Sequence, residues 1–132
     1  MAISTSKTGR IAIIGASGYG GLQLVKLINE HPNFEISSLN GERSVGKSWN
    51  ETNPFMKILG DKKISKSNID QISQCSDYAI LSLPNGLSSQ LTPLLLEKGI
   101  KVLDLSADYR FKSLDKWKEV YSKEAEKYQS PD

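Results

Sequence analysis

The sequence predicts a doubly wound α/β fold with a mostly parallel, Rossmann-like sheet. A short β-branched run at residues 10–14 ends in glycine, as a strand buried on both faces of a parallel sheet does. Further apolar runs alternate along the chain with segments of helical spacing, which is typical of such sheets. With 132 residues, the chain has the length of one domain that can bury a core.

The first helix and the second strand follow directly from this beginning. Pro32 ends a run of apolar side chains that recur near helical spacing. These side chains are Leu22, Val25, Leu27 and Ile28. Residues 34–39 form a short, half-polar second strand. Residues 40–61 contain glycines and a proline without a clear period, so we expect a long loop with at most a turn of helix.

The second half continues the alternation. Residues 69–75 predict a short helix, and residues 76–83 predict a strand that runs into a turn. Residues 101–105 predict the next strand, and the segment from Ser113 onward predicts an amphipathic helix. Between these two strands, one stripe of leucines predicts another helix, formed by Leu87, Leu91, Leu94 and Leu95.

Composition limits the classes of partner. A net charge of +2 is too small to indicate nucleic acid or an acidic membrane surface. No apolar run approaches the roughly 20 residues of a membrane span, and residues 1–10 lack the apolar centre of a signal peptide, so we expect a cytoplasmic protein. Cys75 and His31 are the single cysteine and the single histidine, so neither a disulfide nor a metal site is expected, and Cys75 is interpreted as structural.

A glycine-rich turn separates the first strand from the first helix. It consists of Gly15, Ala16, Ser17, Gly18, Tyr19, Gly20 and Gly21. Small residues let the chain turn tightly and let N–H groups at the helix N-terminus approach a pyrophosphate, so this turn predicts a dinucleotide site. The alternative is a turn whose glycines only supply positive φ, and the spacing GxxGxxG departs from the commoner GxGxxG.

The loop after the second strand is the expected second contact point of the nucleotide. Glu42 would hold the ribose hydroxyls of NAD, whereas Arg43, with Ser44 and Lys47, would neutralise the 2′-phosphate of NADP. These residue types leave the choice between the two cofactors open, and a solvated charged loop is the alternative without a ligand.

Two later strand ends carry further candidates. Leu83 and Pro84 would line the nicotinamide side of the crevice, although the proline can also serve only to end the strand. At the next strand end, Arg110 would clamp a carboxylate or phosphate, and a surface ion pair between Asp108 and Arg110 is the alternative. Asp104 and Ser106 lie in the same segment.

Together these segments resemble the N-terminal part of the N-acetyl-gamma-glutamyl-phosphate reductase family, within the semialdehyde dehydrogenase superfamily. The resemblance runs from Ile11 to about Tyr121, through the glycine turn, residues 81–88 and, most specifically, Val102–Phe111. It implies NADPH-dependent reduction of an acyl phosphate to a semialdehyde in arginine biosynthesis, through a thioester on a cysteine. It also implies NADP as cofactor, a small-molecule acyl-phosphate substrate and a homo-oligomeric full-length form.

The resemblance implies site residues by motif match. Residues 15–21 would contact the pyrophosphate, Leu83 and Pro84 the nicotinamide, and Arg110 the anionic end of the substrate. The family's Pro-Gly-Cys-Tyr-Pro type segment with the nucleophile does not occur before Asp132, and Cys75 does not match it. We therefore expect residues 1–132 to be an NAD(P)-binding domain truncated before the catalytic and dimer-forming part, with no catalytic residue and no turnover of its own.

Two departures from the family pattern bear on the cofactor. Asn85 stands where many relatives have histidine, and Gly41–Glu42 replaces a Ser/Arg-rich stretch that often meets the 2′-phosphate, so a preference for NADP depends mainly on Arg43 and Ser44. Two other functions stay open at this point. One is a fragment of aspartate-semialdehyde dehydrogenase, which the Leu105–Arg110 stretch disfavours, and the other is a nucleotide-sensing module without catalysis.

Overall fold

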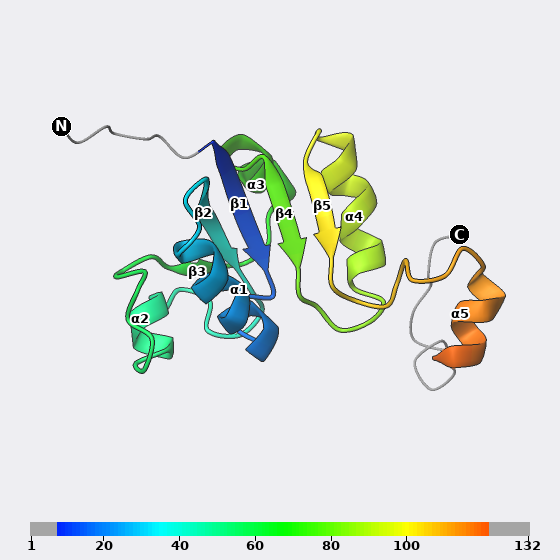
Figure 1. Cartoon of the computed structure of the whole chain (residues 1–132), viewed down its shortest axis with the longest axis horizontal. Coiled ribbons are helices and arrows are strands. Elements are labelled where there is room, and N and C mark those ends of the chain that lie inside the picture. Colours follow the sequence, from blue (N-terminus) through cyan, green and yellow to red (C-terminus); the bar gives the residue numbers. More distant parts are fainter. Residues whose placement is uncertain (1–7, 122–132) are drawn as a thin grey trace.

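The computed structural model describes residues 8–121 and contains a five-stranded, all-parallel sheet with strand order β3-β2-β1-β4-β5. Figure 1 shows β1, β2, β4 and β5 side by side, pointing the same way. The predicted doubly wound α/β fold is confirmed. The direction of winding reverses between β1 and β4, and ligands bind at such a switch point, outside the carboxyl ends of the strands. The expected domain, residues 1–132, includes residues 1–7 and 122–132, which lie outside the described part.

The elements alternate as the sequence predicts. The strands are β1 (Gly9–Ile14), β2 (Phe34–Asn40), β3 (Ile64–Ser65), β4 (Tyr78–Leu81) and β5 (Lys101–Asp104). The helices are α1 (Tyr19–Asn29), α2 (Trp49–Thr52), α3 (Ile69–Cys75), α4 (Ser88–Glu97) and α5 (Leu114–Val120). The expected strand at residues 76–83 is shorter at both ends, and the two-residue β3 was not predicted. Within residues 8–121, no helix has the length and apolar character needed to cross a bilayer.

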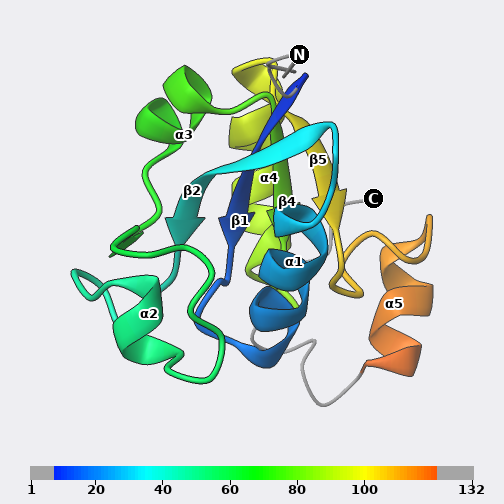
Figure 2. The ribbon, with the colours of Figure 1, turned by 60° about the vertical axis from the view of Figure 1, so that its left-hand side comes forward.

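Helix α1 covers one face of the sheet (Figure 2). Val25 and Ile28 of α1 are buried in the same core cluster as Ile11 and Ile13 of β1. Leu27, which was also predicted to belong to the apolar stripe, is instead 65% exposed. It lies next to Ile28 in sequence and so points to a different side of the helix. The α1 face therefore takes its apolar surface from alternate residues of β1.

Helices α3 and α4 cover the opposite face. There, Ile72 of α3 and Leu95 of α4 pack in one cluster with Ala12 and Ile14, the other set of alternate residues of β1. Leu94, which the leucine stripe placed in the core, is 46% exposed. Because residues 11–14 of β1 are buried on both faces of the sheet, they form a continuous apolar run, and this pattern made β1 the most readily predicted strand.

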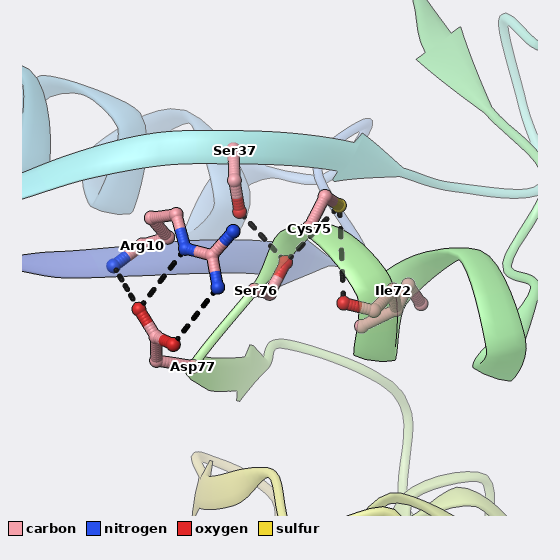
Figure 3. A network of polar contacts seen from close by, with 6 residues as sticks. All are labelled: Arg10, Ser37, Ile72, Cys75, Ser76 and Asp77. Carbon is pink, nitrogen blue, oxygen red and sulfur yellow. Dashed lines mark hydrogen bonds and ion pairs between the residues drawn. The ribbon is translucent and has the colours of Figure 1, made fainter.

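A polar network closes the amino-terminal edge of the sheet, opposite the carboxyl ends of the strands (Figure 3). The Arg10 guanidinium donates to both carboxylate oxygens of Asp77, at 3.2 and 3.1 Å. The hydroxyls of Ser37 and Ser76 lie 2.7 Å apart, and the Cys75 thiol is 3.4 Å from the Ser76 hydroxyl. Cys75 thus belongs to a structural network at the edge away from the glycine turn, as its structural interpretation requires.

The Arg10–Asp77 pair predicts a pH dependence. The side chain and the backbone N–H of Arg10 hydrogen-bond the Asp77 carboxylate, which lowers the pKa of that carboxyl below 3.8. A lowered folded-state pKa stabilises the fold at neutral pH, and this contribution is lost as the pH falls through the folded-state pKa. An NMR titration of the Asp77 carboxyl is expected to show a midpoint below 3.8, shifted back toward that value in Arg10→Met. Equal midpoints in the two proteins would contradict the assignment.

Candidate functional site

The glycine turn lies at the carboxyl end of β1, where it is fixed to the end of β2. Gly15 has a φ of +93°, in the region that favours glycine. The N–H groups of Gly15 and Ala16 both donate to the Asn40 carbonyl, at 2.8 and 2.9 Å. The Gly18 N–H donates to the Gly15 carbonyl at 3.2 Å and closes the turn before α1 begins. The turn is therefore held in a defined position above β1 and β2.

Packing explains three of the four glycines in this turn. A Cβ at Gly15 would collide with the Ser82 carbonyl, and one at Gly20 would collide with the Ser82 hydroxyl. A Cβ at Gly21 would collide with the Gly15 carbonyl. Gly18 differs, because a Cβ there would meet the Gly15 carbonyl only at 3.7 Å and the φ of −90° suits any residue. Gly18 is thus the position where space remains for a ligand to approach the backbone.

The N-terminus of α1 is electrostatically suited to an anion. Gly18, its N-cap, makes no side-chain cap hydrogen bond, and the first turn of α1 contains no acidic residue. Ser17, Gly18 and Tyr19 are exposed. The first N–H groups of a helix lack intrahelical acceptors and carry partial positive charge, so these amides can bind a phosphate.

The N-terminus of α4, by contrast, is occupied by the chain's own carboxylate. Asp108 is fully buried and accepts hydrogen bonds from the N–H groups of Gly86 and Ser89, the latter at 2.8 Å. The Ala107 N–H donates to the Asn85 side chain at 2.9 Å. These bonds join the loop after β4 to the loop after β5, and sequence reasoning missed this role of Asp108.

Arg110 lies in the loop after β5 but does not pair with Asp108 as the surface alternative supposed. Its guanidinium is exposed and donates to the Tyr121 hydroxyl at 3.0 Å. Nearby, burial raises the pKa of the Tyr109 phenol, and the negative charge of Asp104 raises it further, so this phenol is neutral at pH 7. The loop thus presents an exposed guanidinium and a neutral hydroxyl at the carboxyl edge of the sheet.

A mainly apolar cavity of about 210 Å³ opens beside the glycine turn. Its lining residues come from β1, the loops after β2, β3 and β4, and α4, and they are Ile14, Gly15, Gly41, Glu42, Ser67, Leu83, Leu87, Gln90 and Leu91. Leu83, one of the expected site residues, lies in the cavity wall. Pro84, also an expected site residue, is exposed and does not line the cavity. The leucine stripe predicted only a helix, so the position of Leu87 and Leu91 in the cavity wall was missed.

The loop after β2 meets the glycine turn through one side chain. The Ser17 hydroxyl donates to the Arg43 carbonyl at 2.7 Å. Glu42 lines the cavity, whereas the exposed side chain of Arg43 does not. Ser44 has a φ of +63°, so the chain reverses directly after Arg43. The structure therefore brings residues 15–21 next to residues 41–44, as the sequence predicts for a nucleotide site, and leaves the exposed Lys47 at its margin.

These features fit a dinucleotide. Uncapped helix amides and the open space at Gly18 suit a pyrophosphate. The apolar cavity is lined by three leucines together with Gly15 and Gly41, which suits a flat ring. All of these groups lie at the carboxyl ends of β1, β2 and β4, where ligands bind in open α/β sheets.

Sequence comparisons point the same way. Residues 10–128 match the family model described as semialdehyde dehydrogenase, NAD binding domain. The chain is 87% identical over 132 residues to N-acetyl-gamma-glutamyl-phosphate reductase of Prochlorococcus marinus (strain NATL2A), and 52% identical over 123 residues to that of Synechococcus sp. (strain CC9605). The alignments cover 100% and 93% of this chain but 37% and 34% of those proteins. The chain thus spans little more than a third of the relatives' length.

Solved structures share the fold. Aspartate semialdehyde dehydrogenase with NADP from Candida albicans superposes with a TM-score of 0.71 at 18% identity, over 95% of this chain and 41% of that chain. Aspartate semialdehyde dehydrogenase II complexed with ASA from Vibrio cholerae gives a TM-score of 0.63 at 24% identity, over 81% and 30%. Because the family model matches nearly the whole described chain, this protein belongs to the semialdehyde dehydrogenase family through its NAD binding domain.

Proposed function

We propose that this chain is the NADP-binding part of a reductase that converts N-acetyl-glutamyl 5-phosphate to N-acetylglutamate 5-semialdehyde in arginine biosynthesis. The observation that carries the cofactor proposal is the open approach at Gly18 to the uncapped N-terminus of α1. The substrate proposal is supported by the 87% identity to a protein with that activity in its name. The same proposal makes the enzyme cytoplasmic and its full-length form a homo-oligomer.

The glycine turn binds the pyrophosphate in this proposal. The N–H groups at the start of α1, residues 19–21, donate to phosphate oxygens, and the partial positive charge of the helix end stabilises the anion. Gly15 and Gly20 let the turn pack closely against Ser82, directly after β4, and Gly21 lets α1 approach the backbone of Gly15 and Ala16. Gly18 leaves the backbone accessible. Ala16, which is buried, packs the turn onto the core.

The cavity binds a ring of the dinucleotide between Leu83 and the Gly15–Gly41 backbone. Glu42 lines the same cavity, and the end of β2 is where the adenosine ribose is contacted in this fold. The geometry therefore favours adenine beside Leu83, Leu87 and Leu91, rather than the nicotinamide that motif matching implied. Pro84 is exposed and does not line the cavity, so its contact with the nicotinamide stays a prediction.

When NADPH is bound, it supplies the hydride that reduces the acyl group. The residues of this chain bind and orient the cofactor and the substrate. Arg43 and Ser44 neutralise the 2′-phosphate from the loop after β2. Arg110 binds the anionic end of the substrate from the loop after β5, in an orientation supported by its hydrogen bond with Tyr121. We assign no catalytic residue in this chain, and Cys75 lies at the opposite edge of the sheet.

Substitution of Gly18 tests the proposed function. In Gly18→Ala, the added Cβ occupies the open approach, so we expect NADPH to bind at least about 10-fold more weakly in a fluorescence titration of the 132-residue chain. The free energy of unfolding should change by only about 1 kcal/mol, because the backbone conformation suits alanine and only the N-cap preference is lost.

A second variant separates affinity from stability. Gly18→Ser adds a capping hydroxyl, so it should recover the stability of the helix while the cofactor affinity stays low. Wild-type affinity in both variants would contradict pyrophosphate binding at this turn. Reduction of an acyl phosphate by this chain alone would contradict the assignment of a purely cofactor-binding part.

A further inference from the structure

Ser17 links the two halves of the proposed site. Its hydroxyl donates to the Arg43 carbonyl at 2.7 Å, between the glycine turn and the loop after β2. The contact depends on glycine at position 41, because a Cβ there would lie 2.5 Å from the Ser17 oxygen. Ser17 and Gly41 are therefore matched residues that determine where the chain runs directly after β2.

Backbone hydrogen bonds fix both ends of that loop but not its middle. The Gly41 N–H donates to the Ser65 carbonyl at 3.0 Å, and the Gly46 N–H donates to the Ile64 carbonyl at 2.8 Å. Within the described part of the chain, the bond from Ser17 is the single hydrogen bond between residues 42–44 and elements outside the loop 41–47. Loss of this bond would release the segment that carries Glu42 and Arg43.

The loop holds two opposite charges at neighbouring positions. Glu42 lines the cavity, and the Arg43 side chain is exposed, with no hydrogen bond or ion pair from its guanidinium inside residues 8–121. A carboxylate at this place favours ribose hydroxyls and repels a 2′-phosphate, whereas a guanidinium attracts it. The backbone position of residues 42–43 therefore decides which charge meets the 2′ position.

We infer that Ser17 is a positioning residue for cofactor specificity, which acts by holding the Arg43 carbonyl so that the Arg43 guanidinium reaches the 2′-phosphate of NADP. A serine hydroxyl has one proton to donate, and the Arg43 carbonyl accepts it, so this role differs from donation to the pyrophosphate. The inference rests on the proposed function and adds a determinant of its selectivity.

The test compares NADPH and NADH by binding titration for the wild-type chain, Ser17→Ala, Ser17→Thr, Arg43→Ala and the double variant Ser17→Ala/Arg43→Ala. Loss of one hydrogen bond is expected to weaken NADPH binding about five-fold in Ser17→Ala, and to leave NADH binding within about two-fold because NADH lacks the 2′-phosphate. Ser17→Thr keeps a hydroxyl and should restore the NADPH preference. In the Arg43→Ala background, Ser17→Ala should have no further effect on NADPH.

Each contrary result has a distinct meaning. Equal weakening of both cofactors in Ser17→Ala would overturn the inference and assign Ser17 to the pyrophosphate or to the fold, while the proposed function would stand. Additive effects of Ser17→Ala and Arg43→Ala would overturn it as well, because the serine would then act independently of Arg43. A folded wild-type chain that binds neither cofactor would overturn the proposed function itself.

Discussion

Asp108→Ala is expected to lower the free energy of unfolding by about 3–5 kcal/mol, because the N–H groups of Gly86 and Ser89 lose their buried carboxylate acceptor. The carboxylate is fully buried and accepts the N–H groups of Gly86 and Ser89 at the start of α4. Since small domains are stable by only about 5–15 kcal/mol, urea denaturation should show a large drop in the midpoint.

Two further substitutions calibrate this result. Asp108→Asn keeps one acceptor oxygen and should lose less than Asp108→Ala. Asp61→Ala removes the same side chain from an exposed position and should change the stability by no more than about 0.5 kcal/mol. If Asp108→Ala lowered the urea midpoint no more than Asp61→Ala does, the buried carboxylate would not hold the two loops together.

Most of the sheet could be predicted because its strands are local patterns. The β-branched residues of β1 and the helical spacing in α3 and α4 are visible within single segments, and the predicted bounds of α3, residues 69–75, are the observed ones. Strand β3 is different. Its two residues, Ile64 and Ser65, are placed by pairing with Leu39 and Asn40 of β2, and no pattern within the segment itself indicates that partner.

The position of the candidate site could be predicted from the sequence, but the roles of its individual residues could not. That residues 15–21 and 41–44 meet follows from the order of strand, glycine turn, helix and strand. The need for glycine at positions 15 and 20 depends on Ser82, a residue far along the chain, and so could not be seen in the motif. The role of Asp108 was hidden for the same reason, since its partners Gly86 and Ser89 belong to the loop after β4 and to the start of α4.

Gly21→Ala is expected to cost about 2–3 kcal/mol of unfolding free energy, although alanine normally stabilises a helix interior by about 1 kcal/mol relative to glycine. A Cβ at Gly21 would lie 2.6 Å from the Ala16 Cα and collide with the Gly15 carbonyl. These are backbone atoms, and the turn cannot move aside, because the N–H groups of Gly15 and Ala16 both bond the Asn40 carbonyl.

The neighbouring glycines provide a graded comparison in urea denaturation. A Cβ at Gly20 would meet the Ser82 hydroxyl, the end of a side chain that can rotate, so Gly20→Ala should cost less than Gly21→Ala. Gly18→Ala, with 3.7 Å to the nearest atom, should cost least in stability and most in NADPH affinity. Equal stability losses in all three variants would mean that the turn yields as a unit, and the separation between packing glycines and the ligand-facing glycine would then be wrong.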